Sequence, residues 1–212
     1  MAGIIRKAED KDYEKICDLI NPQANEFSMI PITKEYFDET QFFVYEEDGE
    51  TRGCIGRGSY KLETRNGSIE GYEIRSHKSI VNGGGVRLLK TAMEKAKSEN
   101  KEFLYLMTAI PGYYEKFGFE PSDVMPARFL KKCWDCTHYI LGTCDEKPMI
   151  LLFNNSLKAE LTDKFRLERF RDVIRAQKKI KEEGGPKRGY KIFKGIFSDR
   201  VIKIADETVG RQ

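Results

Sequence analysis

Long apolar stretches are missing from this 212-residue sequence. The longest runs, such as Met149 to Phe153, are far shorter than the about 20 apolar residues that a membrane-spanning helix needs. The N-terminal Met-Ala-Gly-Ile-Ile-Arg also lacks a basic stretch followed by an apolar core, the pattern of a secretory signal. We therefore expect a cytoplasmic protein that does not enter a membrane.

Cysteine is sparse and odd in number, and internal repeats and low-complexity tracts are absent. Because the five cysteines occur without a visible secretion signal, we expect no disulfide framework. Hydrophobic residues make up 40% and charged residues 33%, which is ordinary for a globular protein rich in exposed helix. The length allows one full domain with an extension, but not two large domains.

The small net charge of +3 hides an uneven distribution. Residues 155–212 hold 16 Lys/Arg and 9 Asp/Glu, a net of +7, whereas the remainder has a net of −4. A basic tail could favour an anionic partner such as nucleic acid. We favour a solvated helical face instead, because no aromatic stacking motif accompanies the charge.

The alternation of apolar and polar residues predicts a mixed order of strands and helices up to residue 154. Asp48-Gly49 is typical of a hairpin turn, which predicts an antiparallel meander on either side of it. The predicted strands are 4–8, 41–47, 53–60, 68–77, 103–108 and 149–153. One predicted helix begins at Asp10 or Asp12, and three further helices cover 33–37, 86–100 and 112–117.

Two regions follow from this pattern. Residues 1–154 form an α/β (α+β) domain with a mixed, mostly antiparallel sheet flanked by helices. Residues 155–212 form a basic C-terminal helical extension of unknown role, with a long helix over 162–183 and a strand-like run over 190–204. The extension could cover a cleft, pack as an added helix and strand, or mediate a homodimer.

A glycine-rich turn separates the third strand of the meander from the helix over 86–100. Glycines at this place let backbone N–H groups point outward, and the start of a helix adds positive potential, so the turn suits a pyrophosphate. It is not a Walker loop, because no Gly-Lys-Ser/Thr follows, and the dinucleotide spacing is incomplete. A merely flexible turn is the alternative. The turn consists of Asn82, Gly83, Gly84 and Gly85.

A second motif follows the strand over 103–108. Its sequence is Tyr113-Tyr114-Glu115-Lys116-Phe117-Gly118-Phe119. Together with the order of the elements and the glycine turn, it resembles the GNAT superfamily of N-acyltransferases over residues 4–121. The resemblance implies a GNAT-type sheet, acetyl-CoA as the co-substrate, and direct transfer of an acyl group to an amine.

The next segment narrows the resemblance. Met125-Pro126, Cys133-x-x-Cys136 and Cys144-Asp145-Glu146 are similar to the tail of an N-acetylglutamate-synthase-like subgroup. Cys133, Cys136 and Cys144 could form a structural zinc site, which needs a fourth ligand from His138, Cys17 or Cys54. The alternative is three reduced thiols that pack as small hydrophobic groups.

The resemblance also implies roles for residues near the turn. Tyr114 is the expected proton donor to the leaving CoA sulfur, since the pKa of a phenol exceeds that of a thiol; Tyr113 is the alternative. Glu73 or Glu70 could be the general base, and we expect both on the same face of their strand. His77 is a rival base with a better matched pKa. Solvent exposure or a structural ion pair is the alternative for each of these three residues.

The main chain of Gly83 to Gly85 and Val86 is expected to bind the pyrophosphate, with Arg87. Members of the family usually carry Arg or Gln where this sequence has Ile80, and Arg87 could partly replace that residue. The segment over 75–81 also looks shortened and lacks the usual proline.

The leading interpretation is an acetyltransferase that acts on the amine of a small molecule, such as an amino acid. The first alternative keeps the fold and changes the acceptor to a protein lysine or an RNA-linked amine, for which the basic tail gives modest support. The second is a non-catalytic module that binds acyl-CoA or a partner protein, because a fold alone does not decide function.

Overall fold

The computed structural model describes residues 3–24, 31–64, 67–122 and 145–159. Nearly all of them belong to one compact unit, formed by Met1–Pro121 and Glu146–Thr162. The other unit, Ser122–Asp145 with Asp163–Gln212, lies almost wholly outside the described residues, as do the helix and the strand-like run expected over 162–204. The division at residue 154 therefore stays a prediction.

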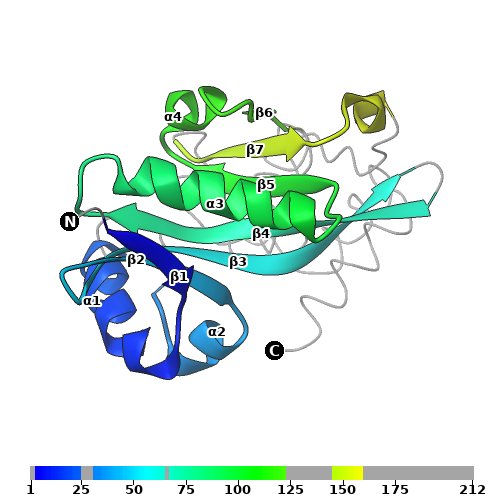
Figure 1. Ribbon diagram of the computed structural model, residues 1–212. Helices are drawn as coiled ribbons and strands as arrows, with labels where there is room; N and C mark the ends of the chain where they lie inside the picture. Colours follow the sequence, from blue (N-terminus) through cyan, green and yellow to red (C-terminus); the bar gives the residue numbers. More distant parts are fainter. Residues whose placement is uncertain (1–2, 25–30, 65–66, 123–144, 160–212) are drawn as a thin grey trace, which may run out of the picture. The chain divides into compact units, whose positions relative to one another are not determined.

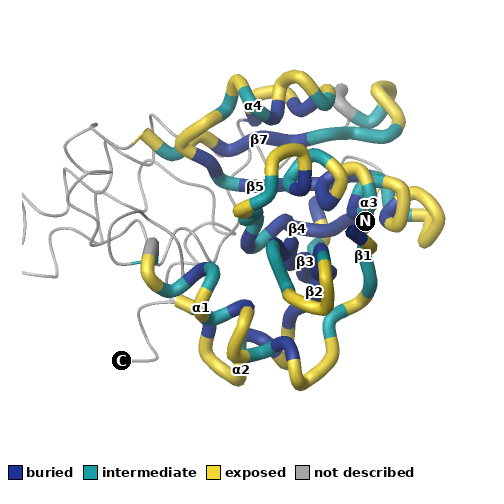
Figure 2. The backbone as a smooth tube through the Cα atoms, turned by 60° about the vertical axis from the view of Figure 1, so that its left-hand side comes forward, coloured by how far each residue is buried: buried dark blue, intermediate teal, exposed yellow. Residues whose placement is uncertain are grey.

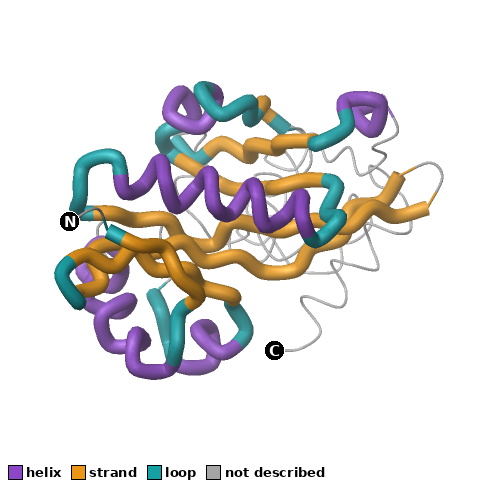
Figure 3. Tube along the Cα trace, in the orientation of Figure 1, coloured by secondary structure: helices purple, strands orange, loops and turns teal. Residues whose placement is uncertain are grey.

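Seven strands form one sheet in the order β1-β2-β3-β4-β5-β7-β6 (Figures 1 and 3). Neighbouring strands are antiparallel except β4 and β5, which are parallel. This confirms the predicted mixed, mostly antiparallel sheet. The strands are β1 (Ile4–Lys7), β2 (Gln41–Glu47), β3 (Glu50–Thr64), β4 (Gly67–Ser79), β5 (Phe103–Thr108), β6 (Glu120–Pro121) and β7 (Lys147–Leu152).

The helices occupy the segments between these strands. The predicted meander is β2-β3-β4, and the turn at Asp48 and Gly49 has positive φ at both residues, as an Asp-Gly hairpin requires. The helices are η1 (Asp10–Asp12), α1 (Tyr13–Ala24), α2 (Lys34–Asp38), α3 (Gly84–Ser98), α4 (Pro111–Glu115) and η2 (Asn155–Ala159).

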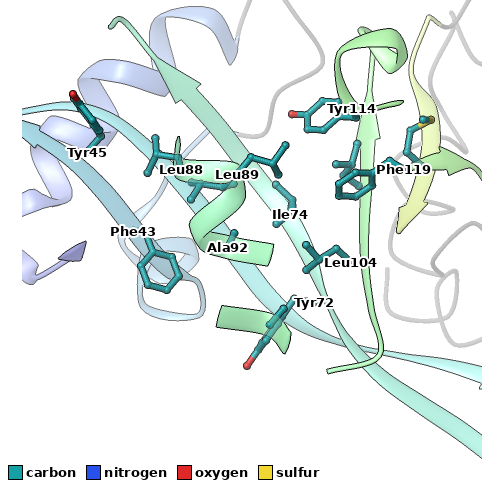
Figure 4. Close-up of a cluster of buried hydrophobic side chains, with 14 residues drawn as sticks. Phe43, Tyr45, Tyr72, Ile74, Leu88, Leu89, Ala92, Leu104, Tyr114 and Phe119 are labelled. Atoms are coloured by element: carbon teal, nitrogen blue, oxygen red, sulfur yellow. The ribbon is translucent and has the colours of Figure 1, made fainter. Parts of the chain in front are cut away.

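Each face of the sheet has its own apolar core, because side chains alternate along a strand. On β2, Phe43 and Tyr45 belong to the core under α3, whereas Phe42 and Val44 belong to the core under α1 and α2. The central strands are therefore buried on both sides, while the outer surfaces of the helices are exposed (Figure 2). Figure 4 shows the first core, in which Leu88, Leu89 and Ala92 of α3 face Ile74 of β4 and Leu104 of β5.

A β-bulge in β4 changes this alternation at one point. Arg57 of β3 pairs with Ile74, and Gly56 pairs with Ser76, so Arg75 is an extra residue on β4. Ile74 contributes to the core under α3. After the extra residue, His77 lies on this same side, where it contacts α3 and α4.

The parallel pairing of β4 with β5 is short. It covers only Gly71 to Glu73 on β4 and Phe103 to Tyr105 on β5. Both strands continue beyond it, to Ser79 and to Thr108 respectively. The two strands thus separate at their carboxyl ends, and the segments that follow them are the glycine turn and α4, which carries Tyr114.

Candidate active site

The glycine turn is built to leave main-chain donors open. Gly83 has a φ of 75°, a conformation that favours glycine, and the N–H of Gly84 donates to the carbonyl of Val81 over 3.1 Å. The first bond of α3 runs from the N–H of Arg87 to the carbonyl of Gly83. Within the described part of the chain, the N–H groups of Gly83, Gly85 and Val86 have no hydrogen-bond acceptor. Open amides at a helix start favour an anion.

The absence of side chains in this turn has a steric reason at two positions. A Cβ at Gly84 would collide with the hydroxyl of Ser79, so that hydroxyl would have to leave its hydrogen bonds with Val81. A Cβ at Gly85 would lie 3.4 Å from Nε2 of His77, so a larger side chain would press on the imidazole. Asn82 is exposed beside them.

The side chain of Arg87 contacts the N-terminal end of the sheet. Its guanidinium donates to the carbonyl of Gly3 over 2.7 Å and to the hydroxyl of Tyr45 over 3.2 Å, and it lies over the Tyr45 ring. Its backbone N–H is already bonded within the helix. Arg87 therefore fastens α3 to the N-terminal end of the sheet, and its expected contact with a phosphate stays a prediction.

His77 connects Tyr114 to the glycine turn. Its Nδ1 lies 3.1 Å from the hydroxyl of Tyr114, and its Nε2 lies 2.9 Å from the carbonyl of Gly85. A carbonyl oxygen only accepts hydrogen bonds, so Nε2 must carry a proton. In the neutral imidazole, Nδ1 is then the acceptor, and the phenol of Tyr114 donates to it.

Burial sets the charge states of this pair. Loss of solvent lowers the pKa of His77, which favours the neutral imidazole, although the bond to the Gly85 carbonyl acts in the opposite direction. Burial raises the pKa of Tyr114 well above its ordinary value, so its hydroxyl keeps its proton. Both groups are thus neutral near pH 7, and a proton can move between them.

Tyr113 lies beside this pair without joining it. Its ring centroid is 5.0 Å from that of Tyr114 and 6.0 Å from that of His77, and it is half-buried. Loss of solvent raises its pKa as well. Of the two tyrosines considered as the proton donor, Tyr114 is the one that is buried and hydrogen-bonded to His77.

The expectation that Glu70 and Glu73 share a face of β4 is wrong, because residues three apart in a strand point to opposite faces. Glu70 is exposed and paired with Lys61 and Lys101, which lowers its pKa to about 2. Glu73 is only 2% exposed. Its neighbours Tyr72 and Ile74 pack in the core under α3, so Glu73 lies on the opposite face. Glu73 therefore remains a candidate base, and Glu70 does not.

Arg75 is a residue of this region that the sequence did not single out. Its Nε lies 3.6 Å from Oε2 of Glu73, and its Nη1 donates to the hydroxyl of Thr40 over 2.9 Å. A Cβ at Gly58 would collide with the guanidinium, so glycine there gives Arg75 its place. A glycine within a strand, where it often marks a close approach of another group, is the one sequence signal that could have indicated this contact.

Most of the predicted zinc ligands belong to the segment over 133–144. Cys133, Cys136, His138 and Cys144 lie outside the described residues. The two remaining cysteines are free thiols: Cys54 is buried, which raises its pKa to about 12, and Cys17 is half-buried with its thiol 3.6 Å from the carbonyl of Ile32. Within the described ranges no cluster of His, Cys, Asp and Glu could hold a metal ion. The zinc site stays a prediction.

None of the helices among the described residues is long and apolar enough to cross a membrane.

Comparison with known families gives one match, to the model of the acetyltransferase (GNAT) family, over residues 6–119. This range includes the glycine turn, His77 and Tyr114. No curated protein matches the chain.

Solved structures share the fold at low sequence identity. N-acetylglutamate synthase from Neisseria gonorrhoeae, complexed with coenzyme A and N-acetyl-glutamate, is 20% identical, with a TM-score of 0.56 over 72% of this chain. The match spans only 35% of that protein. Rv2747 from Mycobacterium tuberculosis, in complex with CoA and NLQ, is 16% identical over 71% of this chain and 99% of its own, with a TM-score of 0.54. Arabidopsis thaliana Naa50, in complex with the bisubstrate analogue CoA-Ac-MVNAL, is 15% identical over 72% of this chain and 100% of its own, with a TM-score of 0.52.

Proposed function

The chain belongs to the acetyltransferase (GNAT) family. We propose that it is an acyl-CoA-dependent N-acetyltransferase whose acceptor is the primary amine of a small molecule such as an amino acid. The neighbour from Neisseria gonorrhoeae, complexed with N-acetyl-glutamate, supports this acceptor class. The contact that carries the proposal is the chain of hydrogen bonds from Tyr114 through His77 to Gly85, because it joins a buried proton donor to the turn with open amides.

The turn supplies the binding site for the acyl donor. The N–H groups of Gly83, Gly85 and Val86 fit the oxygens of a pyrophosphate, and the start of α3 adds its positive potential. The donor would then extend toward the point where β4 and β5 separate, after Glu73 and Tyr105. There a main-chain N–H of β4, within residues 75–79, would polarise the thioester carbonyl.

The acceptor must lose a proton before it attacks. Glu73 is the proposed base for the ammonium group, directly or through a water molecule, since it is a buried carboxylate at the last position where β4 pairs with β5. Tyr114 is the proposed donor to the departing sulfur, since its high pKa keeps it protonated until a thiolate forms.

A direct assay tests the proposal. Purified protein with acetyl-CoA is offered amino acids, spermidine, N-terminal peptides, lysine peptides or no acceptor, and release of the CoA thiol is followed. Turnover with amino acids but not with peptides is expected. Turnover with peptides alone would instead favour the protein amine, the acceptor class suggested by the Naa50 neighbour.

Two matched substitutions test the proposed base in the same assay. Glu73→Gln should lower kcat about 10²-fold or more, the usual range for loss of a general base. Glu70→Gln, on the opposite face of the same strand, should leave kcat close to that of the wild type. Equal effects of the two changes would remove Glu73 from the mechanism.

A further inference from the structure

The hydrogen bond from Tyr114 to His77 is not explained by a tyrosine that protonates the sulfur without help from another residue. In the neutral state, the phenol of Tyr114 gives its single proton to Nδ1 of His77. Its oxygen therefore presents only lone pairs to other partners. A group in this state can accept a proton more readily than it can donate one to a thiolate.

The imidazole is held so that it can complete this exchange. The N–H of Nε2 donates to the carbonyl of Gly85 over 2.9 Å, so Nδ1 is the ring nitrogen that can take up a further proton. The groups that face His77 in the described part of the chain are Tyr113 and Tyr114 of α4 and the Gly85 carbonyl of α3, and none of them carries a charge. Among the described residues, an imidazolium formed here would have no carboxylate partner to retain it, so it would return its proton readily.

We propose that His77 and Tyr114 form a proton shuttle, which takes a proton from the acceptor nitrogen after attack and delivers it to the departing sulfur. This inference rests on the proposed acetyltransferase function. It changes the role of His77 from a base that acts on the substrate to a residue that acts through Tyr114.

The steps balance without an external acid. After Glu73 has taken one proton from the ammonium, the attacking nitrogen carries one surplus proton in the tetrahedral adduct. That proton passes to the oxygen of Tyr114, and the hydroxyl proton of Tyr114 passes to Nδ1 of His77. When the C–S bond breaks, the sulfur takes the electron pair and a proton from Tyr114, and Nδ1 returns its proton to the phenol. The amide and the free thiol are formed, the pair is restored, and Glu73 releases the first proton to solvent.

The first measurement needs no substrate. The chain contains two histidines, so ¹⁵N NMR of the full protein, with His138→Gln for assignment, resolves the ring nitrogens of His77. We expect a protonated Nε2 and an Nδ1 that accepts a hydrogen bond. Tyr114→Phe should move the Nδ1 resonance toward that of a free acceptor, whereas Tyr113→Phe should leave it close to the wild-type position. An Nδ1–H tautomer, or no response to Tyr114→Phe, would overturn the proposal.

The second measurement separates proton transfer from positioning. His77→Gln retains an amide donor and an amide acceptor but cannot bind a proton, whereas His77→Phe has neither group. Both variants should lose about 10²-fold or more in kcat, with KM for acetyl-CoA little changed. The solvent isotope effect in mixtures of H₂O and D₂O should indicate more than one moving proton in the wild type and fewer in the variants. Recovery of kcat in His77→Gln would mean that His77 only positions Tyr114.

The two failures can be told apart. If the wild-type protein transfers acetyl groups and His77→Gln is as fast, the shuttle is wrong and the acetyltransferase function stands. If the wild type releases no CoA thiol with any amine, the proposed function is wrong and the shuttle is lost with it, even where NMR shows the expected pair.

Discussion

At the scale of single residues, the imidazole of His77 determines which atoms of the site can move a proton. It is neutral because burial lowers its pKa, and it is oriented because a carbonyl and a phenol bind its two nitrogens. Histidine usually serves as an acid or base because its pKa lies near neutrality. Here its use depends on a pKa below that range, since only the neutral ring can accept a proton.

The pH dependence of kcat should therefore contain a limb that belongs to His77. Because the pKa is lowered, the neutral ring persists below the ordinary value of about 6.5, and kcat should fall only as the pH drops through this lower pKa. In His77→Phe this limb should vanish from the kcat profile. A wild-type profile that falls already above pH 7 and is unchanged in the variant would contradict the assignment.

Two glycines with the same backbone conformation allow a matched test of the turn. Gly83 and Gly49 both have a φ of 75° and open space around a Cβ. Replacing either with alanine should cost about 1 kcal/mol of unfolding free energy, because L-residues resist positive φ. Only Gly83→Ala should also weaken binding of acetyl-CoA, as measured by titration calorimetry. An equal affinity in both variants would show that the conformation of the turn is not needed for binding.

At the scale of helices and strands, the pattern of apolar residues was sufficient for most of the fold. The meander, the helix α3 and the strand β5 all follow from local periodicity and turn chemistry. The bulge at Arg75 did not, because an extra residue leaves no mark in composition, and its effect is a change of side-chain direction after Ile74.

The part of the site that consists of main-chain groups was predictable from the sequence. The open amides follow from glycines before a helix, and a place for Tyr114 near the glycine turn follows from the resemblance. Long-range side-chain contacts could not be predicted in this way. Arg87 follows three glycines and looks like a phosphate ligand, yet it reaches Gly3, 84 residues away in sequence.

Replacement of Arg87 distinguishes these two roles. Arg87→Ala removes the bonds to Gly3 and Tyr45 and the packing on the Tyr45 ring, which should lower the unfolding free energy by about 1–2 kcal/mol. The dissociation constant for acetyl-CoA should stay within the range of the wild type, as measured by calorimetry below the melting transition. A large loss of affinity in a folded variant would restore the guanidinium to the phosphate site.

At the scale of the whole described unit, one sheet joins two cores that would otherwise be separate. Val44 and Tyr45 are neighbours on β2, but they belong to the cores under α1 and α3 respectively. Neither core can lose its packing without exposing strands that the other core also needs. Stabilisation at one face should therefore be felt at the other.

Acetyl-CoA binding at α3 should protect α1 from hydrogen exchange. At a concentration of 100 times the dissociation constant, a ligand raises the free energy of unfolding by about 2.7 kcal/mol. Amides of α1 that exchange through global unfolding should slow by about 10²-fold, although no residue of α1 lies in the proposed site. Protection confined to α3 and α4 would show that the two cores unfold independently.

The extra residue in β4 also has a consequence for how related sequences are compared. It determines which face of the sheet the later side chains of β4 point to. A chain one residue shorter at Arg75 would keep Glu73 in place and turn His77 to the far side of the sheet, away from Tyr114. A histidine in the same alignment column could then be chemically unrelated to this one. Insertion and deletion, rather than substitution, would be the events that create or abolish this pair.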